Sequence, residues 1–198
     1  MQKRMFRDRY GLTDLVLSGQ KTQTRDVIKI QDERLDYLRG WNLDGGFAEF
    51  GRDGEEPLRL YPKYYVGEVV AVAQSYQKAY PNADFEMVKK WTFMTESAGW
   101  KNKMFVRPDL MPHAIKITKI RFEKLQDISE EDCLKEGILK SDKYAMPYGI
   151  TEKVAPNCVF FFYKTPKEAF AALIDKINGY GTWESNPYLF VYDFELVK

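Results

Sequence analysis

The segment 187–197 constrains the fold more than any other, because its apolar side chains alternate with the period of a β-strand. One face of this strand would carry Tyr188, Phe190, Tyr192, Phe194 and Leu196. Leu189 and Val191 place apolar side chains on the opposite face. The pattern therefore predicts a strand whose first half is buried on both sides.

A second apolar run, at 69–76, is short and rich in valine, which predicts another strand buried on both faces. Gln74 lies near the end of this run, where a polar side chain must find hydrogen-bond partners or face a pocket. The segment 158–163 is rich in phenylalanine and predicts a further strand.

The segment 114–125 predicts a strand with a bend at 118–119, because its apolar side chains change face there. The side chains concerned are Ile115 and Ile117 before this point, and Ile120 and Phe122 after it. Such a change of face indicates a β-bulge, which is a device that bends strands in barrels.

Two short helices are predicted, one near the N-terminus and one in the second half of the chain. In 11–17, Leu12, Leu15 and Val16 share one apolar stripe, and Gly19 suits the residue that ends a helix. The segment 129–137 begins with a capping-box pattern and ends at a glycine, which predicts a second short helix.

The helix signal at 165–179 is the strongest in the chain. Thr165 can cap the helix, Pro166 fits its first position and Glu168 completes a capping box. The apolar face of this helix comprises Phe170, Leu173, Ile174 and Ile177, and Gly179 marks its end. A further helix is predicted within 81–94, where Asp84, Phe85, Val88 and Lys89 have suitable spacing.

The remaining segments carry little regular signal. Turn clusters indicate that 31–62 is a long surface insertion, and 138–157 is predicted to be a loop. The length of the chain fits one domain, residues 1–198. Short strands, short helices and a bulge predict an α+β domain built on a small, partly closed β-barrel.

Composition narrows the class of protein. The chain has no apolar run long enough to span a membrane, and its basic N-terminus lacks the apolar region of a secretory signal. Cys133 and Cys158 are isolated, and the single histidine, His113, has no metal-ligating neighbour. We therefore expect a reduced, cytoplasmic protein with no structural metal site and no cofactor.

The charge is unevenly distributed, although the formal net charge is only +1. Residues 1–29 hold seven Lys or Arg against three Asp or Glu, and residues 101–125 hold seven against two. If the two segments meet in the fold, they form a positive face of the kind that binds polyanions. If they lie apart, they are simply solvated.

The loop 19–25 concentrates an amine, two threonine hydroxyls and a guanidinium in a few residues. Lys21 and Thr24 are three residues apart, so a helical turn or a tight loop can bring them together. A threonine becomes a nucleophile when a base takes its proton, and Lys21 can do so if burial or the neighbouring Arg25 lowers its pKa. The pattern predicts either a Thr/Lys pair for acyl transfer or a solvated loop whose hydroxyls bond their own backbone.

The segment 100–108 interleaves aromatic and basic residues. This pattern is typical of a surface that binds single-stranded nucleic acid, and also of an edge strand. In the first case Lys21, Arg25, Lys101, Lys103 and Arg107 would bind phosphates. Trp100 or Tyr76 would then stack on a base.

The chain resembles the ASCH domain family, a group of small β-barrels in the PUA-like superfamily that is linked to RNA. Gly19, Lys21 and Thr24 fit the G-x-K-x-x-T-x-R signature of the family in register, and Arg25 lies one residue before the position of its arginine. The blocks that resemble the rest of the family are 65–70, 100–112, 115–137 and 181–187 into the final strand. The chain looks most like the longer phage- and prophage-associated members, with insertions near 31–62, 77–99 and 138–157.

This resemblance implies a barrel with a cleft in which a nucleic acid or nucleoside binds. Some small bacterial members are amidohydrolases that deacetylate N4-acetylcytidine, which would make Thr24 the nucleophile and Lys21 its activator. The third catalytic group would be a glutamate at the end of the second block, where this chain has Gln74. Glutamine cannot take a proton, although it can orient a base amide through hydrogen bonds.

Three functional hypotheses follow. The first is a module that binds RNA or a nucleotide in a cleft around the 19–25 loop. The second is an amidohydrolase that deacylates N4-acetylcytidine-like nucleosides through Thr24 and Lys21. The third is a protein-interaction domain of a mobile element.

Overall fold

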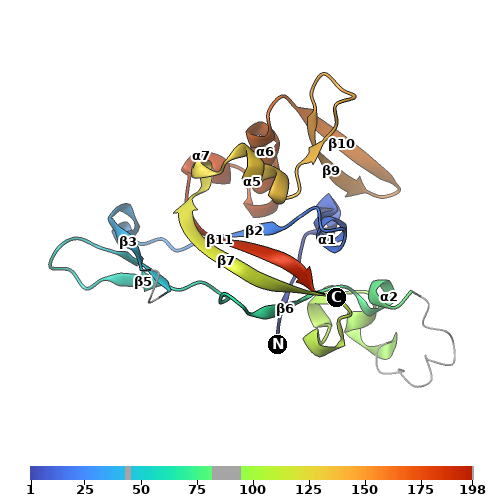
Figure 1. Ribbon diagram of the computed structural model, residues 1–198, viewed down its shortest axis with the longest axis horizontal. Coiled ribbons are helices and arrows are strands. Elements are labelled where there is room, and N and C mark those ends of the chain that lie inside the picture. Colours follow the sequence, from blue (N-terminus) through green and yellow to red (C-terminus); the bar gives the residue numbers. More distant parts are fainter. Residues whose placement is uncertain (43–45, 82–94, 198) are drawn as a thin grey trace.

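The protein has an α+β fold in which strands predominate and helices are few (Figure 1). The computed structural model describes residues 1–42, 46–81 and 95–197. Its central element is a five-stranded sheet with the strand order β1-β6-β7-β11-β2. These strands are β1 (Gln2–Arg4), β6 (Val69–Val72), β7 (Ala114–Lys124), β11 (Tyr188–Val197) and β2 (Gln23–Val27). The predicted α+β class is therefore confirmed.

Strand β11 lies inside this sheet, between β7 and β2. Leu189 and Val191 are fully buried on one face, and Phe190, Tyr192 and Phe194 are buried on the other. Both faces of the first half of β11 are therefore covered, which explains why apolar residues occur on both faces there.

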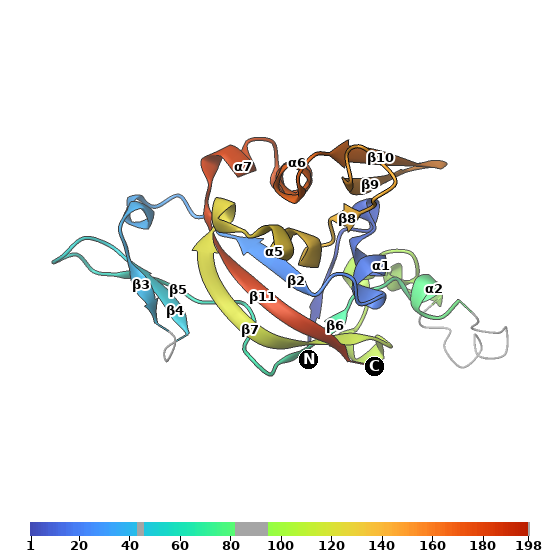
Figure 2. The same cartoon turned by 45° about the horizontal axis from the view of Figure 1, so that its top comes forward.

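The predicted bulge in β7 is confirmed. Asp193 of β11 pairs with Lys119, whereas the next residue, Phe194, pairs with Ile117. Thr118 is therefore skipped in the register between the two strands. Figure 2 shows β7 and β11 bending together at the centre of the fold.

The sheet curves so that its two edge strands, β1 and β2, are linked by side chains. Arg4 of β1 donates hydrogen bonds to Asp26 Oδ2 at 2.7 Å and to Thr24 Oγ1 at 2.9 Å, both on β2. In the described chain β1 pairs only with β6, and β2 pairs only with β11, so these strands form no closed barrel.

The helices are short, apart from α6 (Pro166–Asn178). The other helices that the structure describes are α1 (Leu12–Leu17), α2 (Tyr76–Ala79), α5 (Glu130–Lys135) and α7 (Thr182–Ser185). Residues 1–42, 46–81 and 95–197 also contain the 3-10 turns η1 (Asp8–Tyr10), η2 (Glu33–Asp36), η3 (Ala98–Trp100), η4 (Lys103–Phe105), η5 (Pro108–Leu110) and η6 (Leu125–Asp127). The predicted capping box is confirmed, because Thr165 and Glu168 form both of its hydrogen bonds at the start of α6.

The structure corrects the prediction that 31–62 and 138–157 are irregular. The first segment forms a three-stranded antiparallel sheet of β3 (Leu38–Asn42), β4 (Phe47–Phe50) and β5 (Leu58–Leu60). The second contributes β8 (Leu139–Lys140) and β9 (Tyr148–Val154), which join β10 (Asn157–Tyr163). These strands are short, and a register shift near Gly40 breaks the alternation of β3, so periodicity could not reveal them.

The segment 100–108 contains no strand, so the edge-strand interpretation is wrong. Its residues form the end of η3, then η4 and the start of η5. The helix predicted within 81–94 lies almost wholly outside the described residues.

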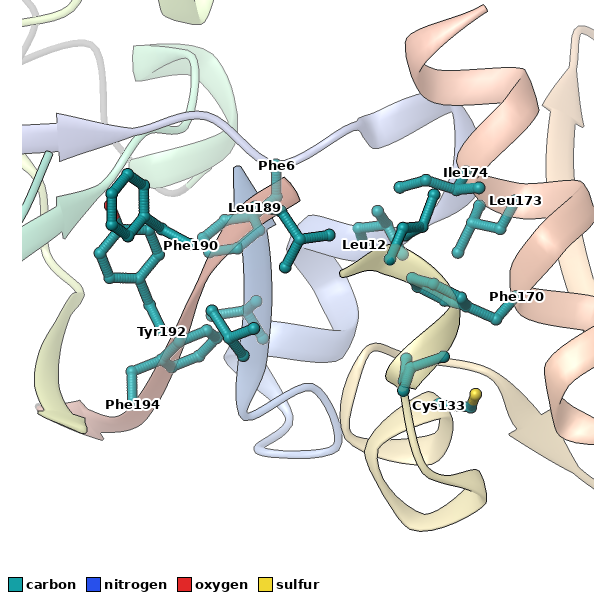
Figure 3. Close-up of a cluster of buried hydrophobic side chains, with 14 of the residues drawn as sticks. Phe6, Leu12, Cys133, Phe170, Leu173, Ile174, Leu189, Phe190, Tyr192 and Phe194 are labelled. Atoms are coloured by element: carbon teal, nitrogen blue, oxygen red, sulfur yellow. The ribbon is translucent and has the colours of Figure 1, made fainter. Parts of the chain in front are cut away.

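The core lies between the five-stranded sheet and the helices α1, α5 and α6 (Figure 2). Figure 3 shows Phe170, Leu173 and Ile174 of α6 directed toward Leu12 of α1. Phe6, Phe190, Tyr192 and Phe194 extend the same cluster onto the sheet. This packing fixes α6 beside β1 and β2, where the candidate site lies.

Candidate functional site

A cavity of about 390 Å³ lies beside the two edge strands, next to the side chains of the 19–25 loop. Lys21, Thr24 and Arg25 line it from the loop and β2, and Glu136 lines it from the end of α5. Arg4 and Phe6 form a wall on the β1 side, and the apolar face of α6 forms the opposite wall. The structure thus brings Lys21, Thr24 and Arg25 of the 19–25 segment to one pocket.

Lys21 is buried, with only 2% of its surface exposed, so its charge needs a partner. Its Nζ donates hydrogen bonds to Glu136 Oε2 at 2.6 Å and to the Glu136 carbonyl at 2.7 Å. Burial lowers the pKa of Lys21, although the Glu136 carboxylate opposes this effect. The amine is therefore easier to deprotonate than an exposed lysine.

Arg25 is also enclosed, because its side chain is 1% exposed and contacts three carboxylates. Its Nη1 lies 2.8 Å from Glu136 Oε1, and its Nη2 lies 2.9 Å from Glu123 Oε1 and 3.6 Å from Asp132 Oδ2. Glu136 consequently bridges Lys21 and Arg25. Both cations were predicted to bind phosphate, but their main partners in the structure are carboxylates of the protein itself.

Thr24 is buried at the cavity, and its Oγ1 accepts a hydrogen bond from Arg4 Nη2. Burial alone would lower the pKa of Arg4, but the Asp26 carboxylate outweighs it and raises the pKa, so the guanidinium stays charged. A charged donor on a hydroxyl oxygen stabilises negative charge that develops there. This arrangement can support nucleophilic chemistry at Thr24.

The lining of the cavity is strongly basic. It carries seven Lys or Arg residues, Lys3, Arg4, Arg7, Lys21, Arg25, Lys29 and Lys63, against two carboxylates, Asp26 and Glu136. Arg7, Lys29 and Lys63 are exposed, and no ion pair within the described residues involves them. These three cations are therefore free to bind an anionic ligand.

The structure does not bring Gln74 to this cavity. Gln74 is buried just beyond β6, and its backbone N–H donates to the sulfur of Met111. Its Oε1 accepts no hydrogen bond among the described residues. Glu136 supplies the carboxylate beside Lys21 instead.

Tyr76, Trp100 and Lys101 also lie away from the cavity lining. Tyr76 is buried, and its hydroxyl accepts a hydrogen bond from the backbone N–H of Arg107. Trp100 packs against the small cluster that contains Tyr76, whereas Lys101 is exposed. A buried Tyr76 cannot stack on a base without a rearrangement of this cluster.

Lys103 and Arg107 have partners within the protein. Lys103 Nζ donates to Asp8 Oδ1 at 2.8 Å and to the Phe6 carbonyl, and Arg107 pairs with Asp109 on the surface. Lys3 Nζ donates to backbone carbonyls of the second basic segment, at Met104 and Val106. The two basic segments thus touch, but the second contributes no cation to the cavity.

Two residues of the site, Arg4 and Glu136, were missed in the sequence. Arg4 belongs to the basic N-terminal segment, and only the curvature of the sheet brings it to Thr24. Glu136 immediately precedes Gly137, which ends α5 with a φ of 100° and lies against Leu15. This close packing of the end of α5 on α1 directs Glu136 toward Lys21, and no local pattern signals it.

The described residues contain no cluster of His, Cys, Asp and Glu that could hold a metal ion. Cys133 is buried, and burial raises the pKa of its thiol to about 12, so it is inert at neutral pH. None of the described helices has the length and apolar character needed to cross a membrane.

Comparison with known proteins finds no matching family model, no similar curated protein and no similar solved structure.

Proposed function

We propose that the protein binds a nucleotide in the cavity beside Lys21, Thr24 and Arg4. The observation that carries this proposal is the excess of cations over carboxylates in a pocket of about 390 Å³. Small-molecule pockets commonly have volumes of roughly 300–1,000 Å³ and combine apolar walls with a few polar groups. The apolar face of α6 offers a surface to a base, and the free cations at the rim offer partners to a phosphate.

Arg7 provides the sharpest test, because it lines the cavity, is exposed and takes part in no ion pair of the described chain. Binding of the four ribonucleoside 5′-monophosphates should be measured by calorimetry at low salt. We expect binding that weakens when salt is raised and when Arg7 is replaced by alanine. Lys116→Ala is the control, since Lys116 is exposed on β7 and does not line the cavity. A folded protein that binds none of the four at low salt contradicts the proposal.

A second function, hydrolysis of an acylated nucleoside, is favoured by the Glu136–Lys21–Thr24–Arg4 arrangement. Glu136 supplies the carboxylate that Gln74 lacks and is held 2.6 Å from the Lys21 amine. The Arg4 guanidinium donates to Thr24 Oγ1 at 2.9 Å. A nucleophile, a base of lowered pKa and a cation are therefore present in one pocket.

In this reaction the neutral Lys21 amine takes the proton of Thr24 while Oγ1 attacks the acyl carbon. The carbon–nitrogen bond of the amide then breaks, and the leaving exocyclic amine takes the proton back from Lys21. Water hydrolyses the acyl-threonine ester and releases the carboxylic acid. Arg4 stabilises the charge on Oγ1, and Glu136 orients the Lys21 amine.

The test is incubation of the folded protein with N4-acetylcytidine and chromatography of the products. We expect release of cytidine that is abolished by Thr24→Ala and retained in Thr22→Ala, because Thr22 lines a different hollow. Gln74→Glu should leave the rate unchanged, since Gln74 does not line the cavity. No turnover by the wild-type protein would contradict the hydrolase proposal but not nucleotide binding.

A further inference from the structure

A second hollow, of about 210 Å³, lies along the same edge strand as the candidate site. It shares Asp26, Val27, Lys29 and Lys63 with the lining of the first cavity. Because four residues border both spaces, the two hollows are adjacent along β2, and we call them together the edge groove. The edge groove extends from Thr24 toward β5 and the residues that follow it.

The second hollow differs in character from the first, because aromatic and aliphatic side chains dominate its lining. Tyr61 lies at its border and is 59% exposed. The Tyr61 ring packs against Phe47 with 5.5 Å between the ring centroids, so one side of the ring is supported by the protein. Ile30 on the same hollow is 50% exposed. An exposed ring held in this way suits stacking by a nucleic-acid base.

Lys29 and Lys63 mark the boundary between the two hollows, since both side chains line each of them. Both are exposed, and neither pairs with a carboxylate in the described part of the chain. Lys63 Nζ lies 5.2 Å from the centroid of the Tyr64 ring. Two free cations at the boundary between two hollows can bind the phosphate that joins consecutive nucleotides.

We propose that the edge groove binds a single-stranded nucleic acid, with one nucleotide in the first cavity and the base of its neighbour stacked on Tyr61. The phosphate between them binds Lys29 and Lys63. This inference rests on the proposed function, because it assigns the first cavity to a nucleotide. It adds that the ligand is a strand rather than a free nucleotide.

The first experiment compares the affinity for a nucleoside monophosphate with that for five-nucleotide RNA and DNA strands, measured by fluorescence anisotropy competition. We expect the strands to bind more tightly, and Tyr61→Ala to weaken strand binding by about 5- to 150-fold, the usual range for loss of one stacked base. Binding of the monophosphate should not change. The matched control is Tyr65→Ala, because Tyr65 is 64% exposed but borders neither hollow.

The second experiment measures the salt dependence of strand binding for the double variant Lys29→Ala/Lys63→Ala. Each phosphate neutralised on a single strand contributes about 0.7 to the slope of log affinity against log salt, and both lysines bind one phosphate, so the slope should fall by about 0.7. The control is Lys116→Ala/Lys164→Ala, which removes two exposed lysines outside the groove. Whether the RNA or the DNA strand binds more tightly identifies the natural class of strand.

The outcomes separate the two proposals. If the monophosphate binds as tightly as the strands, or if Tyr61→Ala has no more effect than Tyr65→Ala, the strand inference is wrong and the nucleotide site stands. If neither the monophosphate nor the strands bind, the proposed function is wrong and the inference falls with it.

Discussion

At the scale of single residues, the chemistry of the 19–25 loop depends on carboxylates from distant parts of the chain. The sequence predicts Lys21 and Arg25 as phosphate-binding cations, which assumes that they reach solvent. Both are buried instead, and Glu136 pairs with each of them. Neither the burial nor Glu136 could be deduced from spacing, because α5 approaches the loop only through tertiary packing.

Replacement of Arg25 by alanine should destabilise the fold strongly. The change leaves Glu123, Asp132 and Glu136 without a buried cation that now contacts all three. Loss of one partner of a buried ion pair costs about 3–5 kcal/mol in the free energy of unfolding. Urea denaturation measures this cost. Arg59→Ala should cost no more than about 1 kcal/mol, because the Arg59–Glu49 pair is exposed. Similar costs for the two variants would contradict the structural role of Arg25.

Asp8 should make the stability of the protein depend on pH in acid. Burial alone would raise the pKa of Asp8, but the hydrogen bonds from Lys103 and Thr13 outweigh it and hold the pKa below 3.8. Since the pKa is lower in the folded state, this contribution is complete above 3.8 and is lost as the pH falls through the folded pKa. Urea midpoints measured between pH 7 and pH 2.5 should fall less in Asp8→Asn than in the wild type. An identical pH profile for the two proteins would contradict this assignment.

At the scale of elements, the sequence predicts those strands and helices whose signals are local and long. Strand β11, the bulged strand β7 and helix α6 all show unbroken periodicity or a complete capping box. The phenylalanine-rich segment 158–163 correctly predicted β10, but the strands β3, β4, β5, β8 and β9 could not be predicted in the same way. These strands are two to seven residues long, and their stability comes from pairing with neighbours rather than from a periodic pattern.

The capping box of α6 should stabilise the wall of the cavity. Thr165 Oγ1 accepts the N–H of Glu168 at 3.2 Å, and the Glu168 carboxylate accepts the N–H of Thr165 at 3.4 Å. Thr165→Ala removes the first bond and should lower the free energy of unfolding by about 1 kcal/mol. Thr165→Ser keeps the hydroxyl and is the matched control. If chemical denaturation shows the same loss in free energy of unfolding for both variants, the Thr165 hydroxyl does not stabilise the helix.

At the scale of the whole molecule, the open edges of the central sheet form the site. A closed barrel would pair β1 with β2 through the backbone and would fill the space that the cavity occupies. In the described chain the two edges are joined through the Arg4 side chain, so the gap remains lined with polar groups. The site therefore depends on a feature of the complete sheet, and no single stretch of sequence contains it.

Arg4 should couple the two edges of the sheet. A guanidinium can bond Thr24 and Asp26 at the same time through two nitrogens, whereas a lysine ammonium is a single point of charge on a flexible stem. Arg4→Ala removes the side-chain link between β1 and β2 and leaves each strand held only by the backbone partner on its one paired side. Amide hydrogen exchange in β1 and β2 should therefore become faster. Exchange in β7 and β11 should change little, since they pair on both sides.

Arg4→Lys distinguishes coupling from simple charge balance. If charge alone matters, the lysine variant should exchange at the wild-type rate in β1 and β2. If the simultaneous contacts to Thr24 and Asp26 matter, exchange in Arg4→Lys should resemble that in Arg4→Ala. Because Arg4 also donates to Thr24 Oγ1 in the cavity, Arg4→Ala should bind nucleoside monophosphates more weakly than the wild type. Wild-type exchange and wild-type binding in Arg4→Ala would together show that the edges of the sheet are held by other contacts, and that the cavity does not depend on their closure.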